Sequence, residues 1–300
     1  MENTTKYNLW FYIWWLIGLF FIGGFVSQII ASAIIELKFS GYEAKDLLEL
    51  TTEQPQAWHY VRVVQIIHAI FSFLIPSLII WKMYSGNLNF SYPKNKRSSI
   101  LAFTVIPVLL FTFHPLAQSF YIFNKNIQFF EPLHSTLLEM EVQMEMLITG
   151  MLADQTLTVI MVNFFIIAIV ASILEELFFR GVLQRILSDH IDHHLAIFIA
   201  AFAFSFIHFQ FFGFIPRLAI GIFFGYLYWH TKRLSIPIFA HFLFNSMQLI
   251  AHYYISPIGN ETTKEGIVML PISITITSTI LFFSLYFVFY NSLIKKRASS

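Results

Sequence analysis

Two adjacent glutamates and an arginine interrupt a long apolar run in the stretch SILEELFFRG, residues 172–181. Charged side chains at membrane depth cost several kcal/mol each, so a chain rarely keeps them without a task. Residues four apart share one face of a helix, and Glu176 and Arg180 are therefore predicted to form an ion pair. Glu175 faces another side of the helix, and its apolar surroundings suit a general base that works near neutral pH.

Three further polar residues lie in apolar runs downstream. His208 follows FAFSFI, and His241 and Asn245 stand four residues apart in IPIFAHFLFNSMQ, on one helix face. Counting about 1.5 Å per residue from the expected cytoplasmic helix ends places Glu175, His208 and Asn245 at about 17–21 Å and His241 at about 11 Å. We expect these four residues to line one cavity that is entered from the cytoplasmic side. The alternative is packing, because single histidines and asparagines also join helices.

The composition is that of a membrane protein. Of the 300 residues, 57% are hydrophobic, 18% are aromatic and only 12% are charged, with a net charge of +1. The net charge says nothing about nucleic acid, but the lack of a basic patch interleaved with aromatic residues predicts no nucleic-acid partner. The chain has no cysteine, which excludes disulfides, a thiolate nucleophile and a thiolate metal site.

Eight apolar runs are long enough to cross a membrane, which takes about 20 mostly apolar residues. They cover residues 9–35, 62–83, 99–122, 157–187, 194–212, 214–231, 234–254 and 269–293. The sequence therefore predicts an all-α, polytopic membrane helix bundle. Residues 133–152 form a further helical pattern, either an amphipathic helix on the membrane surface or a solvated loop helix. Gly221 and Gly225 are spaced to let a neighbouring helix approach closely.

The basic residues predict the orientation of this bundle. With eight spans, both termini and the even-numbered loops share one side, which carries eleven basic and three acidic residues. The opposite side carries six basic and twelve acidic residues. Because lysine and arginine accumulate on the cytoplasmic side, both termini are expected to be cytoplasmic in a multi-pass protein of the cell membrane.

Three motifs together resemble the CPBP intramembrane proteases, which include the type II CAAX prenyl endopeptidases and the bacterial Abi proteins linked to bacteriocin processing and self-immunity. These motifs are EExxxR at 175–180, FxxxH at 204–208 and HxxxN at 241–245. The resemblance covers residues 157–254. It implies a catalytic core over 156–255, preceded by transmembrane helices and polar loops over 1–155 and followed by a transmembrane helix and basic tail over 256–300.

The resemblance also implies a role for each motif residue. Glu175 and His208 would activate a water molecule. His241 and Asn245 would complete the site, either as metal ligands or as groups that stabilise the oxyanion of a tetrahedral intermediate. The predicted ion pair would hold the helix and orient the site.

The sequence leaves a metal-dependent and a metal-free mechanism open. Glu175, His208 and His241 match the three-ligand open site of a hydrolytic zinc centre, so a divalent metal such as zinc is one reading. A glutamate and a histidine that share a water, with an amide donor nearby, suffice without a metal.

The resemblance implies an endopeptidase that hydrolyses a peptide bond of a peptide or lipid-modified substrate at the lipid bilayer. One alternative is a non-catalytic bacteriocin self-immunity or membrane scaffold protein of the same fold, against which the intact polar residues argue. Another is a transporter in which a buried glutamate–histidine set relays protons. The sequence shows no repeated half and no paired broken helices, which such transporters often have.

Overall fold

The predicted all-α class is confirmed. The computed structural model describes residues 7–39, 42, 47–86, 96–255 and 270–297, and over these residues every regular element is a helix. Along the chain they are α1 (Leu9–Lys38), α2 (Leu47–Glu53), α3 (Ala57–Ala69), η2 (Ile70–Leu74), α4 (Ile75–Ser85), α5 (Lys96–Lys125), α6 (Leu133–Leu152), α7 (Leu157–Asn163), η3 (Phe164–Val170), α8 (Ala171–Glu176), η4 (Leu177–Gln184), α9 (Arg185–Ser188), α10 (His193–Phe206), α11 (Phe214–Thr231), α12 (Ser235–Ile250), η5 (Ala251–Ile255) and α13 (Ile272–Arg297). The η elements are π-helical.

Five helical stretches in the described residues are long and apolar enough to cross a membrane. They are Leu9–Lys38, Ala57–Ser85, Leu101–Lys125, Leu157–Ser188 and Ile272–Ser292. The other three predicted spans are the shorter helices α10, α11 and α12, the last continued by η5. The 14 residues of α10 extend about 21 Å. The hydrocarbon core of a bilayer is thicker, about 30 Å. A multi-pass membrane protein is confirmed, whereas the count of eight spans and the orientation of the termini stay predictions.

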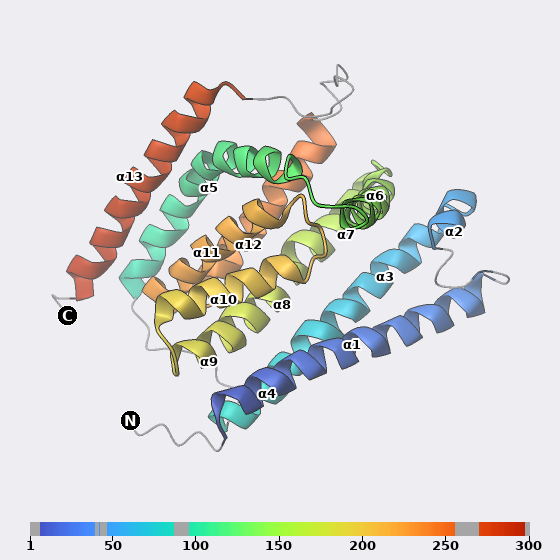
Figure 1. Cartoon of the computed structure of the whole chain (residues 1–300), viewed down its shortest axis with the longest axis horizontal. Helices are drawn as coiled ribbons and strands as arrows, with labels where there is room; N and C mark the ends of the chain where they lie inside the picture. The colour runs from blue at the N-terminus through green and yellow to red at the C-terminus, as the bar shows by residue number, and fades with distance from the viewer. Residues whose placement is uncertain (1–6, 40–41, 43–46, 87–95, 256–269, 298–300) are drawn as a thin grey trace. The chain divides into compact units, whose positions relative to one another are not determined.

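The chain forms two compact units, each assembled from two distant segments. Unit 1 comprises Met1–Phe90 and Val142–Ala196, and unit 2 comprises Ser91–Glu141 and Ile197–Ser300. Within unit 1, α1 packs along α3, η2 and α4 (Figure 1). Within unit 2, α5 packs against α11, α12 and α13 (Figure 1). The division predicted at residues 155 and 255 stays a prediction.

The helix that carries Glu175 is continuous from α7 to α9 but changes its winding. Both glutamates lie on α8, between the π-helical stretches η3 and η4. In a π-helix each N–H bonds to the carbonyl five residues earlier, so each turn holds more residues than an α-turn. The apolar periodicity of the sequence did not indicate these stretches.

Aromatic rings fix this helix within unit 1. The ring of Phe178 lies 5.5 Å from that of Phe73 on η2 and 5.8 Å from that of Phe20 on α1, between centroids. The ring of Phe179 lies 6.3 Å from that of Phe73. The side chain of Phe179 is fully buried. The turn that follows the two glutamates is therefore anchored to both neighbouring helices.

The segment 133–152 is helical, as predicted, and its end is fastened within unit 1. Gly150 lies directly beneath the indole of Trp58, because a β-carbon at Gly150 would overlap that ring. Buried Arg62 donates from Nη2 to the carbonyl of Met151 at 2.6 Å and from Nε to Oδ1 of Asn163 at 2.8 Å. These bonds tie α3 to the end of α6 and to α7. Whether α6 lies on a membrane surface stays a prediction.

Candidate active site

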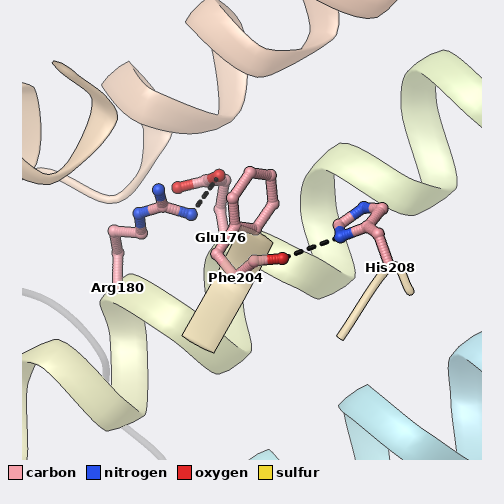
Figure 2. Close-up of polar contacts among 4 residues, drawn as sticks. All are labelled: Glu176, Arg180, Phe204 and His208. Atoms are coloured by element: carbon pink, nitrogen blue, oxygen red, sulfur yellow. Dashed lines mark hydrogen bonds and ion pairs between the residues drawn. The ribbon is translucent and has the colours of Figure 1, made fainter. Parts of the chain in front are cut away.

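The ion pair predicted on the site helix is present and buried. Nη1 of Arg180 lies 2.8 Å from Oε1 of Glu176, and both side chains have no exposed surface (Figure 2). Two charges withdrawn from water are tolerated when they neutralise each other at short range. The neighbouring Glu175 is only half-buried. The two adjacent glutamates therefore occupy different environments, one enclosed with an arginine and one on a partly accessible face.

Unit 2 brings two predicted site residues together around the ring of Phe204. The ring centroids of His208 and His241 lie 5.1 Å and 5.7 Å from that of Phe204, both in edge-to-face orientation. The imidazole of His241 also stacks on Phe224 at 5.2 Å. Edge-to-face and stacked contacts hold ring planes in preferred orientations. Phe204 thus acts as a common support for both histidines.

A close approach of α11 to α10 makes this arrangement possible. A β-carbon placed on Gly221 would lie 3.2 Å from Cδ1 of Phe204 and 3.2 Å from Cβ of Ala201. These distances are tighter than ordinary van der Waals contact, so a side chain at this position would have to push Phe204 or Ala201 aside. The close helix packing predicted for Gly221 is confirmed.

His208 lies just beyond the end of a helix, which corrects the expected span 194–212. The helix α10 ends at Phe206, and Phe209 has a φ of 52°. This left-handed conformation is strained for a bulky residue and cannot continue an α-helix. His208 therefore stands in an irregular turn over residues 207–213 between α10 and α11.

The carbonyl of Phe204 fixes the tautomer of His208. Nδ1 of His208 lies 2.7 Å from this oxygen (Figure 2). A carbonyl oxygen can only accept a hydrogen bond, so Nδ1 must donate. In the neutral imidazole the lone pair then resides on Nε2, which is free to take up a proton or to bind a metal.

The remaining predicted residues of unit 2 lie on α12. His241 is buried, with 4% of its surface exposed, and Asn245 is half-buried. Their four-residue separation keeps both side chains on the same face of the helix. Glu175 belongs to unit 1, and the expectation that it shares one cavity with these three residues stays a prediction.

The three metal ligands predicted from the sequence do not all belong to one unit. The tautomer of His208 leaves Nε2 available as a ligand, and His208 and His241 both contact Phe204 in unit 2, while the predicted third ligand, Glu175, lies in unit 1. Within neither unit do the described residues gather three or more histidine, aspartate or glutamate side chains that could hold a metal ion. The zinc set of Glu175, His208 and His241 stays a prediction.

Three polar side chains outside the predicted set hold the turn that carries His208. Asn124 donates from Nδ2 to the carbonyl of Phe211 and accepts the N–H of Ile215 at Oδ1. Ser205 donates to the carbonyl of Phe214 at 2.7 Å. The guanidinium of Arg217 donates to Gln210, at 2.8 Å to its side-chain oxygen. Sequence reasoning missed these residues. A polar amide at the end of an apolar run was the available signal for Asn124.

A cavity of about 270 Å³ opens in unit 1 without including any predicted site residue. It is lined by Pro55, Trp58, His59, Arg62, Gly150, Ala153 and Asp154. Nε and Nη2 of Arg62 donate to protein oxygens at its border. We therefore regard this cavity as a gap beside a structural network and not as the active site.

The fold and the motif residues define a multi-pass helical membrane protein with a buried glutamate–arginine pair and two histidines that pack against one phenylalanine. Residues 157–247 match the family described as type II CAAX prenyl endopeptidase Rce1-like. A stretch of 99 residues is 30% identical to the "Putative membrane peptidase YdiL" of Bacillus subtilis (strain 168). The match covers 33% of this chain and 40% of that relative. No solved structure matches the chain. These findings confirm the resemblance to the CPBP proteases over the region that carries the motifs.

Proposed function

We propose that the protein is an intramembrane endopeptidase of the CPBP type that hydrolyses a peptide bond of a peptide or lipid-modified substrate. The observation that carries the proposal is the fixed tautomer of His208, which leaves Nε2 unprotonated on a ring that packs, like that of His241, against Phe204. A hydrolytic site needs a base in this state, held in place before the substrate arrives. The match of residues 157–247 to a peptidase family supports the same chemistry.

In the proposed reaction Glu175 and His208 together withdraw a proton from water, and the hydroxyl oxygen attacks the scissile carbonyl carbon. The carbonyl π electrons move onto oxygen, where donors from His241 and Asn245 stabilise the negative charge. The abstracted proton passes to the leaving amine as the C–N bond breaks, which restores the base. A divalent metal, when bound by Glu175, His208 and His241, would supply Lewis-acid polarisation of the water.

The test uses the purified full chain in detergent and two probes: a fluorogenic peptide that ends in a farnesylated CAAX sequence and a pool of unmodified fluorogenic peptides. We expect cleavage by the unmodified protein and loss of it in Glu175→Gln and His208→Gln. His190→Gln is a matched control, because Nδ1 of His190 also bonds the carbonyl four residues earlier, at 2.8 Å, in an exposed loop. It should retain full activity.

The same preparation distinguishes the mechanisms. Metal content and activity after chelation report whether a divalent metal takes part, with restored activity on adding zinc as the metal-dependent outcome. Cleavage that persists in Glu175→Gln would overturn the assigned role of that residue. The immunity or scaffold alternative predicts that the protein cleaves neither probe. It also predicts that cells with the Glu175→Gln variant resist bacteriocin as well as cells with the unmodified protein.

A further inference from the structure

The turn that carries His208 poses an energetic problem. Since α10 extends only about 21 Å from its first residue, the irregular backbone over residues 207–213 falls within the expected depth of the bilayer. Backbone N–H and C=O groups in the hydrocarbon region must be hydrogen-bonded within the protein, because each unsatisfied group costs several kcal/mol. Side chains from elsewhere must therefore supply the partners that a regular helix would provide.

Asn124, near the end of α5, supplies two of these partners at once. Its Nδ2 donates to the carbonyl of Phe211 at 2.5 Å, and its Oδ1 accepts the N–H of Ile215 at 3.0 Å. The side chain is 3% exposed, so the amide has exchanged water for these bonds. One planar group thus clamps the end of the turn to the first residues of α11.

The clamp bears on His208 because Phe211 and His208 lie three residues apart in one short turn. Arg217 also bonds Gln210 within this turn, and Ser205 bonds Phe214 just after it. The imidazole of His208 is bonded to the carbonyl of Phe204 on α10, and the next residue, Phe209, holds a strained left-handed conformation. Strained backbone persists only where its surroundings fix it. Release of Phe211 would let Phe209 relax to a more favourable φ, and the rotation would pass directly to the adjoining His208.

We propose that Asn124 is a positioning residue for His208: it holds the turn so that the Nδ1–H of His208 stays on the Phe204 carbonyl and Nε2 stays available as the base. The consequence for catalysis rests on the proposed function. The effect of Asn124 on the tautomer of His208 is independent of the proposed function and is measured separately.

The experiment compares Asn124→Ala and Asn124→Asp with the unmodified full chain. The aspartate keeps the size of the side chain and the acceptor for Ile215 but loses the donor to Phe211. Asn126→Ala is the matched control, because the exposed side chain of Asn126 donates at 2.9 Å to the carbonyl of Ile122 at its own helix end. Thermal unfolding of each variant in detergent identifies any that fails to fold.

The decisive readout is the ¹⁵N spectrum of histidine-labelled protein in micelles, with the His208 signal assigned by its loss in His208→Gln. We expect the Nδ1–H tautomer in the unmodified chain and in Asn126→Ala, and a mixed or Nε2–H signal in Asn124→Ala and Asn124→Asp. An unchanged His208 signal in a folded Asn124→Asp variant would overturn the proposal.

The kinetic readout is cleavage of whichever fluorogenic peptide the unmodified chain accepts. Both Asn124 variants should lower kcat roughly 10- to 100-fold with KM nearly unchanged, as misplacement of a catalytic group does. A uniform loss that simply follows unfolding, with the His208 tautomer intact, would show a merely structural role. If the unmodified chain cleaves neither probe, the proposed function fails, and the ¹⁵N signal still decides the role of Asn124.

Discussion

The guanidinium of Arg180 and the carboxylate of Glu176 lie 2.8 Å apart in unit 1, both without exposed surface, whereas Glu175, one residue before Glu176, is partly accessible. Replacing Arg180 by alanine leaves a buried carboxylate without its cation. We expect Arg180→Ala to lower the free energy of unfolding by roughly 3–5 kcal/mol. Glu175→Gln preserves size and should change stability little.

The measurement is thermal unfolding in detergent, followed by intrinsic tryptophan fluorescence, because the chain has 6 tryptophans and no cysteine for a thiol-reactive dye. The pair Glu175→Gln and Glu176→Gln provides the sharpest comparison. We expect the first to abolish cleavage at nearly unchanged stability and the second to act mainly on stability. Equal destabilisation by both variants would contradict the division of roles between the two glutamates.

A methyl group at Gly221 should disturb both histidines at once. It would press on Phe204, the ring that His208 and His241 share, and overpacking of this kind typically costs about 1–3 kcal/mol. We expect Gly221→Ala to lose activity more than its stability loss explains. Gly18→Ala is the control, since a β-carbon there meets nothing within 4 Å and alanine favours the helix. Comparable activity in both variants would refute this role of Phe204.

Arg62 should matter for the attachment of α6. Arg62→Ala leaves the carbonyl of Met151 and the amide oxygen of Asn163 with fewer donors, at an expected cost of roughly 2–4 kcal/mol. We expect faster proteolysis within 142–152, measured by limited digestion and mass spectrometry. Arg62→Lys keeps the charge but cannot bond both acceptors at once. Its rate of proteolysis should lie between those of the unmodified chain and Arg62→Ala. Digestion at the unmodified rate would count against the network.

The carboxylate of Asp154 should stabilise the folded state near neutral pH but not in acid. The backbone N–H of Thr156 donates to its carboxylate at 2.8 Å, and this bond, helped by the Thr156 side chain and by Arg62 and His59, lowers the pKa of Asp154 below its usual range. A depressed pKa stabilises the folded state above the unfolded pKa of about 4, and the effect is lost as the pH falls further. The stability difference between the unmodified chain and Asp154→Asn should therefore shrink from pH 6 to pH 3. If this stability difference did not change with pH, the carboxylate of Asp154 would not contribute to folding through its lowered pKa.

The uneven distribution of lysine and arginine between the two sides of the predicted bundle predicts its orientation in the membrane. Reporter fusions at Ser91 and at Ser300, both outside the described residues, should each read cytoplasmic. The control is a fusion at residue 129, which lies between two predicted spans on the opposite side. A non-cytoplasmic signal at either serine would reverse the expected face of entry to the site.

The sequence predicted features that depend on local spacing. Four-residue separation correctly paired Glu176 with Arg180, and the glycine spacing anticipated the close packing at Gly221. Features that depend on distant contacts were missed, because no periodicity encodes them. Arg62 and Asn163 are 101 residues apart, and Asn124 is 87 residues from Phe211. The early end of α10 was also missed, since apolar residues continue past Phe206 while the backbone turns at Phe209.

The π-helical stretches η3 and η4 on either side of α8 are the places where this helix can lose a residue without turning its faces. A π-turn accommodates one residue more than an α-turn, so deleting a single residue from η3 converts it to α-helix while the flanking turns keep their faces. The same deletion inside α8 would rotate every later side chain by about 100°. A chain that lacks one residue of η3 should therefore keep Glu175 and Glu176 on their present faces, whereas a chain that lacks one residue of α8 should not.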